Sequence, residues 1–351
     1  MASTLSTPPR VVVADDSGFM RRLLCQALVT AGFDVVGEAA DGDAALALCR
    51  RHRPDVLSLD LAMPGRDGIG VLKALRTMDL KTVVVVVSAF SPAHGARAVD
   101  ALAEGAFDLV VKPEIGTALE VFVREIGAKA HAAAQAAKRP RSAAPAPRPL
   151  ATGNGVHRPP GGGRLPLVVI ACSTGGPKAL GALLPQLPRP LGVGTLIVQH
   201  MPPGFTAPLA ARLDRASLLN VREAQEGDLV GRDDVFVAPG GSHMHLLAGG
   251  KLHLTADEDA IGGLRPRADL TIIDAAQHYG RRLLLVVLTG MGKDGLEGAR
   301  AVKRAGGRIL VEAESTCTVY GMPRAVSEAN LADAELPLHD LPRAIAEECA
   351  T

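Results

Sequence analysis

Aromatic residues are scarce in this sequence, and tryptophan is absent. The 351 residues include 2 tyrosines and 7 phenylalanines, so aromatics make up 3% of the chain. Proteins that bind single-stranded nucleic acid stack bases on aromatic side chains, and such a surface is not expected here. Charge of one sign is also lacking, because 38 Lys and Arg face 37 Asp and Glu. We therefore expect no general attraction to nucleic acid or to an anionic membrane.

Long hydrophobic runs and paired cysteines are lacking as well. The longest apolar runs, such as Leu167–Cys172 and Leu283–Leu288, are strand-sized, whereas a membrane helix needs about 20 residues. Residues 1–10 contain no apolar core of a signal peptide. The 5 cysteines are odd in number and form no C-x-x-C pair, which argues against a disulfide framework or a zinc site. We expect a cytoplasmic protein without membrane insertion, with a monomer as the default state.

What the chain does contain is ordinary globular composition, 47% hydrophobic and 21% charged, enough for two domains. A break in composition separates them. Residues 129–164 are rich in Ala, Pro and Gly and contain no acidic residue, which predicts a flexible, partly extended linker. Its basic residues could form an arm for nucleic acid or an acidic partner, but Pro and Gly dilute them, which favours a solvated linker.

Both flanking regions have the pattern of α/β domains. Residues 9–128 alternate five apolar strand patterns with five helical patterns, which predicts a parallel sheet covered by helices on both faces. Residues 165–348 repeat the alternation and add two short strands joined by a Gly-Gly turn near residue 250. We predict a second, doubly wound and mainly parallel α/β domain with a β-hairpin. The segment that follows Met322 has a helical pattern.

Chemically functional residues follow the predicted strands of the first domain. Asp15 and Asp16 end the first strand and Asp60 ends the third, while Ser88 and Lys112 end the fourth and fifth. Parallel topology brings these ends together. Three crowded carboxylates repel one another without a cation, and their oxygens suit Mg²⁺. The pattern indicates a carboxylate that accepts a phosphoryl group beside Mg²⁺; helix capping is the alternative role for such acids.

The same residues lie in motifs that resemble the receiver domain of response regulators: ADDS (14–17), LDLAMPGRDG (59–68), SAF (88–90) and VKP (111–113). The resemblance implies a flavodoxin-like (βα)5 fold. One departure concerns the position three residues before the lysine, where many receivers have an aromatic residue that switches with phosphorylation. Here it is Leu109, so this aromatic switch is not expected.

The resemblance also implies the roles of these residues. Asp60 would be phosphorylated, Asp15 and Asp16 would bind Mg²⁺ together with it, and Ser88 and Lys112 would contact the phosphate. A histidine kinase of the chemotaxis type would be the phosphodonor.

Three residues of the second domain predict a different kind of site. Ser173 lies between an apolar strand and a helix, in a turn that is close to G-x-S-x-G with Ala171 in place of the first Gly. His200 ends the next strand, and Asp294 follows a Gly-rich turn after a later one. Serine needs a base within reach, and the base needs a carboxylate that fixes its tautomer. The three therefore form a candidate Ser-His-Asp triad, although each alone is compatible with a structural role.

The motifs around them resemble the catalytic domain of chemotaxis protein-glutamate methylesterases, the CheB family: ACSTGGP (171–177), VQHMPPGF (198–205), VAPGG (237–241), LTGMGKDG (288–295) and VYGMPRAV (319–326). A receiver and a linker in front of this domain are that family's arrangement. The resemblance implies that Ser173 attacks glutamyl methyl esters of chemoreceptors, that His200 is the base and that Asp294 orients it. Family members also deamidate receptor glutamines, and the esterase reaction needs no cofactor.

Other residues of the second domain are ambiguous. The backbone N–H groups of Thr174 and Met291 are candidate oxyanion donors, with simple loop packing as the alternative. Cys172 is expected to be a buried hydrophobic residue, not a nucleophile. His243 and His245 share a strand face, but no third metal ligand at a suitable spacing is evident. Residues 264–274 contain two arginines that could attract acidic receptor helices.

A receiver joined to an esterase suggests regulation. We expect the unphosphorylated receiver to cover Ser173 and phosphorylation to shift the population towards an open form. Two alternatives remain: a receiver-controlled binding protein with a silent esterase-like domain, and the same chemistry in a chemosensory pathway that does not control motility. A transcriptional regulator would need a helix-turn-helix after the linker, and the strand patterns of residues 165–348 argue against it.

Overall fold

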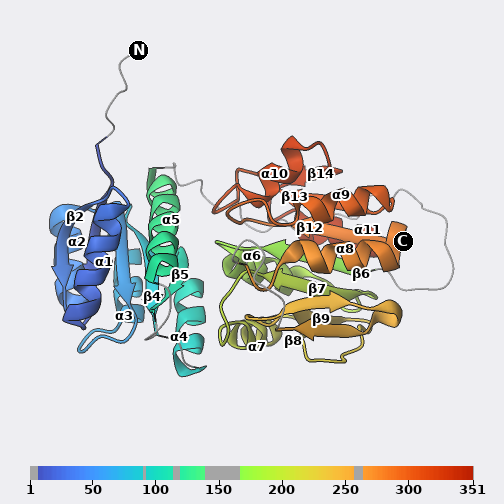
Figure 1. The fold of residues 1–351 in the computed structure, drawn as a ribbon, viewed down its shortest axis with the longest axis horizontal. Coiled ribbons are helices and arrows are strands. Elements are labelled where there is room, and N and C mark those ends of the chain that lie inside the picture. Colours follow the sequence, from blue (N-terminus) through green and yellow to red (C-terminus); the bar gives the residue numbers. More distant parts are fainter. Residues whose placement is uncertain (1–6, 90–91, 114–118, 139–166, 257–263, 351) are drawn as a thin grey trace, which may run out of the picture. The chain divides into compact units, whose positions relative to one another are not determined.

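The structure is a computed structural model that describes five stretches of the chain: residues 7–89, 92–113, 119–138, 167–256 and 264–350. The chain divides into two units at residues 141 and 142, and each unit has its own parallel sheet (Figure 1).

The first unit contains a five-stranded parallel sheet in the order β2-β1-β3-β4-β5. Its strands are β1 (Arg10–Ala14), β2 (Asp34–Ala39), β3 (Val56–Asp60), β4 (Val83–Ser88) and β5 (Asp108–Val111). Its helices are α1 (Gly18–Thr30), α2 (Gly42–His52), α3 (Gly68–Arg76), α4 (Pro92–Ala103) and α5 (Leu119–Lys138). Helix α1 packs with α5, and α3 packs with both α2 and α4, so the helices form two layers. This strand order confirms the predicted flavodoxin-like fold.

Local sequence explains why these elements form where they do. The runs VVVA of β1 and VVVVS of β4 are buried and β-branched, as central parallel strands require. Asp41 and Asp67 precede α2 and α3, and each side chain accepts a backbone N–H in the first turn of its helix, from Ala44 and Gly70 at 2.8 Å. Strand length and helix starts are therefore encoded locally.

The predicted linker begins later than expected. Helix α5 continues to Lys138, ten residues into the segment predicted as linker from residue 129. Alanine is the strongest helix former, and Ala130 and Ala133 are buried. Lys129 also anchors the helix to β5, because its Nζ donates to the carbonyl oxygen of Leu109 at 2.5 Å. The rest of the predicted linker, residues 139–164, lies outside the described residues.

The second unit contains a seven-stranded parallel sheet in the order β14-β13-β12-β6-β7-β9-β8. Its strands are β6 (Leu167–Cys172), β7 (Gly194–Gln199), β8 (Asn220–Glu223), β9 (Asp234–Val237), β12 (Leu283–Val287), β13 (Arg308–Glu312) and β14 (Ala334–Leu336). Strands β10 (His243–Leu246) and β11 (Leu252–Thr255) form a separate antiparallel hairpin. The predicted doubly wound sheet with a β-hairpin is confirmed.

Six helices accompany these strands in the described residues: α6 (Gly176–Leu183), α7 (Thr206–Ala216), α8 (Ala268–Tyr279), α9 (Leu296–Arg304), α10 (Met322–Glu328) and α11 (Leu341–Cys349). Helices α8 and α9 pack closely together and cover β6, β12 and β13. Their core includes Ala171, Ile272 and Val287, all fully buried. The segment after Met322 is only partly helical, because β14 pairs with β13 between α10 and α11.

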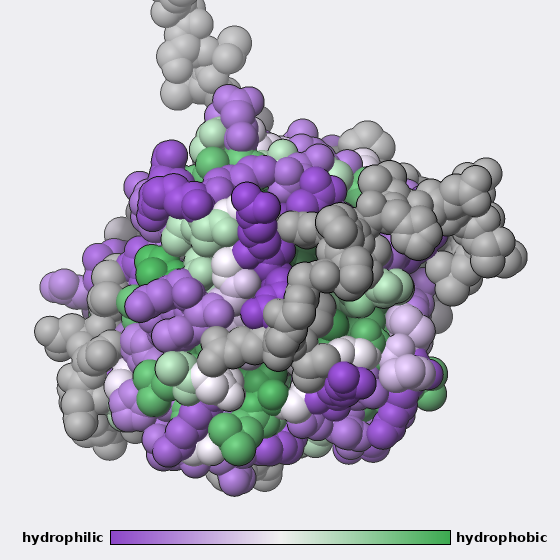
Figure 2. Space-filling model, turned by 90° about the vertical axis from the view of Figure 1, so that its right-hand side faces the viewer, coloured by the Kyte–Doolittle hydropathy of each residue, from purple (hydrophilic) through white to green (hydrophobic). Residues whose placement is uncertain are grey.

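No helix in the described stretches is both long and apolar enough to cross a membrane. On the coloured part of the face in Figure 2, hydrophobic residues form small groups separated by hydrophilic ones.

Candidate active site and phosphoacceptor site

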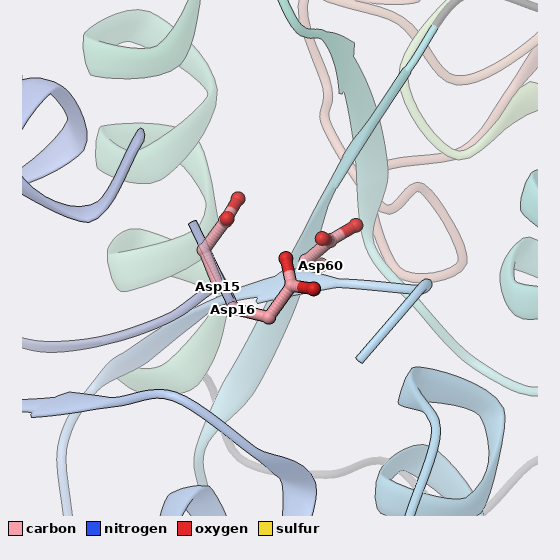
Figure 3. Close-up of side chains that lie close together, drawn as sticks. All are labelled: Asp15, Asp16 and Asp60. Carbon is pink, nitrogen blue, oxygen red and sulfur yellow. The ribbon is translucent and has the colours of Figure 1, made fainter. Parts of the chain in front are cut away.

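In the first unit, the ends of β1, β3 and β5 bring the predicted acidic residues and the lysine together. Asp15, Asp16 and Asp60 each offer one oxygen, and these oxygens lie within 4.8 Å of one another (Figure 3). The Nζ of Lys112 lies 2.7 Å from Oδ2 of Asp60 and 2.8 Å from Oδ2 of Asp15. The predicted phosphoacceptor Asp60 therefore shares one site with Asp15, Asp16 and Lys112.

Negative charge exceeds positive charge at this site, which holds three carboxylates and one lysine. Burial raises the pKa of Asp15, and hydrogen bonding and attraction to Lys112 only partly offset it. Burial alone would lower the pKa of Lys112, but its contacts with Asp15 and Asp60 raise it. One lysine thus faces three carboxylates. An all-oxygen donor set with excess negative charge fits Mg²⁺, which keeps several waters and takes few protein ligands.

Two further positions complete the description of this unit. Ser88 is buried at the end of β4, next to β5: its carbonyl accepts the backbone N–H of Lys112 at 2.8 Å. Leu109 occupies the position at which many receivers have an aromatic residue. It is buried in β5 with 2% of its surface exposed.

In the second unit, the candidate triad lies at the ends of three adjacent strands. Ser173 directly follows β6, which lies between β7 and β12 in the sheet. His200 follows β7, and its N–H donates to the carbonyl of Cys172 at 3.0 Å, so the serine and histidine backbones are neighbours. Asp294 follows β12. The chain leaves β6 towards one side of the sheet and later returns to the other, which creates the switch point where α/β sheets bind ligands.

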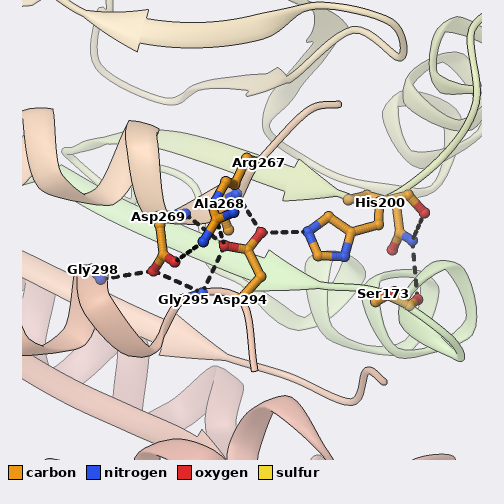
Figure 4. Close-up of polar contacts among 9 residues, drawn as sticks. Ser173, His200, Arg267, Ala268, Asp269, Asp294, Gly295 and Gly298 are labelled. Atoms are coloured by element: carbon orange, nitrogen blue, oxygen red, sulfur yellow. Dashed lines mark hydrogen bonds and ion pairs between the residues drawn. The ribbon is translucent and has the colours of Figure 1, made fainter. Parts of the chain in front are cut away.

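The carboxylate of Asp294 connects the histidine to two helix starts. Its Oδ2 accepts hydrogen bonds from Nε2 of His200 and from the N–H of Ala268, both at 2.7 Å (Figure 4). Its Oδ1 accepts from the N–H groups of Asp269 and Gly295, both at 3.0 Å. Burial alone would raise the pKa of Asp294, but the hydrogen bonds from His200 and the backbone hold it at about 2. The carboxylate is therefore ionised at neutral pH and only accepts.

This arrangement defines the tautomer of His200. Because an ionised carboxylate has no proton to donate, Nε2 of the neutral ring carries the hydrogen. Nδ1 is then the basic nitrogen. Figure 4 shows Ser173 on the side of the ring away from Asp294.

Glycines allow a close approach around Ser173. A Cβ at Gly290 would lie 2.9 Å from Cβ of Ser173, so the turn that contains Met291 packs directly against the serine. Gly175 has a φ of +82°, and a Cβ there would lie 2.4 Å from Cβ of Thr318. The first of these contacts places the Gly-Met-Gly turn beside Ser173, and Thr174, the residue after Ser173, is buried.

Gln199 is a residue that the sequence analysis did not identify. It is buried, and its Nε2 donates to the carbonyl oxygens of Ser173 at 3.0 Å and His200 at 2.9 Å. A Cβ at Gly176 would lie 1.9 Å from its Oε1, so only glycine fits there. A polar residue that ends an otherwise apolar strand, directly before His200, was the available signal.

The remaining candidates have structural surroundings. Burial raises the pKa of Cys172, whose thiol lies 3.1 Å from Oε1 of Gln199, in keeping with an inert thiol. His245 hydrogen-bonds Asp274 at 2.8 Å. Neither histidine of β10 belongs to the three-aspartate cluster, the one potential metal-binding group found among the described residues.

The two arginines of residues 264–274, which the sequence predicts to attract acidic receptor helices, have partners within the second unit. Nη2 of Arg267 lies 3.1 Å from Oδ2 of Asp269, and its Nε lies 3.6 Å from Oδ1 of Asp294. Arg265 donates to the carbonyl of Ala256. Arg267 therefore compensates the charge of two buried acids beside His200.

Comparison with known proteins finds a family for each of the two units. Residues 168–345 match the family model of the CheB methylesterase, and residues 11–123 match that of the response regulator receiver domain. A protein-glutamate methylesterase/protein-glutamine glutaminase of Symbiobacterium thermophilum is 43% identical over 98% of both chains. A protein of the same name from Pyrococcus abyssi is 38% identical over 96% of this chain and 92% of its own.

A solved structure is similar to the second unit. The CheB methylesterase catalytic domain of Thermotoga maritima is 44% identical, with a TM-score of 0.51, over 52% of this chain and 98% of its own. Strand order, site geometry and full-length similarity agree, and this chain belongs to the CheB methylesterase family, with a response regulator receiver domain before the catalytic domain.

Proposed function

We propose that this protein hydrolyses glutamate methyl esters on chemoreceptors and deamidates receptor glutamines, under control of its receiver domain. The observation that carries the proposal is the contact between His200 and Asp294, made beside Ser173 at the switch point of the sheet. Its relatives are named for both activities. The predicted domain limits, 9–128 and 165–348, are part of the proposal, with the first domain extended to Lys138 by helix α5.

The triad would work as follows. Ser173 Oγ attacks the ester carbonyl carbon while Nδ1 of His200 takes the hydroxyl proton. The protonated ring then gives this proton to the departing methoxy group, and methanol leaves. Water attacks the acyl-enzyme with His200 again as base, and the glutamate carboxylate is released. With a glutamine substrate the first step releases ammonia instead.

Asp294 stabilises the charged ring without taking its proton. A carboxylate with a pKa of about 2 remains ionised beside an imidazolium, so it holds the ring and compensates its charge. The oxyanion of the tetrahedral intermediate would accept hydrogen bonds from the backbone N–H groups of Thr174 and Met291. The close packing of Gly290 on Ser173 supports this assignment.

The receiver would regulate this reaction. Asp60 accepts a phosphoryl group from a histidine kinase, and Lys112 and Ser88 contact the phosphate. Asp15, Asp16 and Asp60 would hold Mg²⁺, which would offset negative charge at the phosphoryl oxygens. Phosphorylation is proposed to raise esterase activity in the full chain.

Release of methanol from membranes that carry a methylated chemoreceptor tests the proposal. Wild type and Ser173→Ala are compared with and without a small-molecule phosphodonor such as acetyl phosphate. We expect release by wild type only, increased by the phosphodonor. Equal release by both proteins would exclude Ser173 as the nucleophile, and no release by either would favour a silent binding protein. Release that ignores the phosphodonor would contradict the regulatory part alone.

A further inference from the structure

We propose that Asp269 is a positioning residue for the hydrolytic reaction: its side chain fixes the turn that carries Asp294 and thereby holds Asp294 against His200. This inference rests on the triad proposed above and extends it by a residue that contacts neither serine nor histidine.

The geometry is a reciprocal exchange of helix caps. Oδ1 of Asp269, in the first turn of α8, accepts the N–H groups of Gly295 at 2.9 Å and Gly298 at 2.8 Å, at the start of α9. Asp294, which precedes α9, accepts the N–H groups of Ala268 and Asp269 at the start of α8. Asp269 of α8 thus caps α9, and Asp294, which precedes α9, caps α8 (Figure 4).

Neither helix has a capping side chain of its own. The residue at the N-cap of α8 is Arg267 and that of α9 is Gly295, and neither makes a side-chain cap hydrogen bond. The first N–H groups of a helix need acceptors, and here the acceptors come from the opposite helix. Gly295 also has a φ of +92°, so the backbone between Asp294 and α9 adopts a conformation that other residues rarely take.

Packing and charge hold the pair close. A Cβ at Gly298 would lie 2.6 Å from Cβ of Ile272, so α8 and α9 approach to near backbone contact. The two acids share the N–H of Gly295, and Arg267 pairs with both of them. Without Asp269, the N–H of Gly298 loses its acceptor and Gly295 keeps only Asp294. The turn is then free to rotate, and Asp294 moves relative to His200.

The test compares three variants of the full chain, with phosphodonor present, on membranes that carry a methylated chemoreceptor. Asp269→Ala should lower kcat about 100-fold with KM unchanged, because a misplacement of about 1 Å costs that much. Asp269→Asn keeps an acceptor oxygen and should recover most of the lost kcat. Asp333→Ala is the matched control: Asp333 also accepts a backbone N–H, from Ile309, and pairs with Lys303, but lies at the opposite ends of the strands. Its kcat should stay at the wild-type level.

A spectroscopic signature separates positioning from folding. The Nε2 proton of His200, shared with Asp294 at 2.7 Å, should give a low-field NMR signal that Asp269→Ala shifts or removes and Asp333→Ala leaves in place. Wild-type kcat and an unchanged signal in Asp269→Ala would overturn the positioning role. An equal loss in Asp333→Ala would also overturn it. Ser173→Ala in the same assay keeps the two proposals apart, since its full activity would reject the triad itself.

Discussion

Each unit has a buried aspartate beyond the carboxyl ends of its parallel strands, Asp60 at the end of β3 and Asp294 in the loop after β12, and the two have different surroundings. Asp60 has 3% of its surface exposed and Asp294 has 6%, so burial does not distinguish them. Asp60 shares its site with two other carboxylates and one lysine, and its Oδ1 accepts a single backbone N–H, from Ala62 at 3.2 Å. Asp294 accepts three backbone N–H groups and a histidine. The supply of hydrogen-bond donors, not burial, distinguishes the proposed phosphoacceptor from a carboxylate that hydrogen bonds hold in place.

Asp60→Asn tests the first aspartate of this comparison, the proposed phosphoacceptor. The amide offers no nucleophilic carboxylate oxygen, so acetyl phosphate should no longer form a covalent adduct, as intact-protein mass spectrometry will show. Basal methanol release should stay at the level of the unphosphorylated wild type. An adduct on the variant would place the phosphoacceptor at another residue.

Asp294→Asn tests the second aspartate of this comparison, which hydrogen-bonds His200. If the new amide turns its NH₂ group towards Nε2 of His200, the ring adopts the other tautomer, and Nδ1 then carries the hydrogen and is no longer basic. The kcat for methanol release should therefore fall about 10⁴-fold. Adduct formation at Asp60 should be unaffected, which serves as the internal control. A loss below tenfold would mean that His200 does not depend on Asp294.

Gln199→Glu tests the two hydrogen bonds from the Gln199 side chain to the backbone carbonyl groups of Ser173 and His200. The carboxylate has the shape of the amide but places an acceptor against the carbonyl oxygens of Ser173 and His200, so both contacts become repulsive. A misplaced nucleophile should lower kcat about 100-fold. Gln186→Glu, at an exposed glutamine of the same unit, is the control and should leave kcat unchanged.

The pKa of Asp294 also predicts a pH-dependent stability. A fall from 3.8 to about 2 in the folded state corresponds to about 2 kcal/mol of unfolding free energy. This contribution is present above pH 3.8 and is lost as pH falls towards 2. Urea unfolding followed by tyrosine fluorescence should show Asp294→Asn less stable than wild type at pH 7, with the difference shrinking below pH 4. Both tyrosines, Tyr279 and Tyr320, lie in the second unit, so the signal reports on that unit. An equal difference at all pH values would contradict the linkage.

The smallest effect concerns the thiols. Burial raises the pKa of Cys49 to about 12, and it also raises the pKa of Cys172. Alkylation by iodoacetamide at pH 7 should therefore leave methanol release unchanged, although Cys172 is next to Ser173. Rapid inactivation that substrate prevents would contradict the inert role of this thiol.

The sequence predicted the parts of the molecule that depend on local pattern. Continuous apolar runs that end in Asp, Ser or His indicated both the strands and the residues at their ends. It missed what depends on tertiary contacts. The alanine-rich end of α5 resembled a linker, and its burial and the contact of Lys129 with Leu109 decide otherwise. The exchange between Asp269 and the start of α9 joins segments 26 to 29 residues apart, which no local pattern reveals.

Strand β6 has a consequence for how the second unit folds during synthesis. It pairs with β7 soon after both are made, but its other edge pairs with β12, more than a hundred residues later. Until residues 283–287 emerge, a fully apolar strand has one open edge. Such edges are templates for pairing with other chains. Because the loop of Asp294 follows β12, a nascent chain can complete the triad only after the strand that closes this edge of β6 has been made.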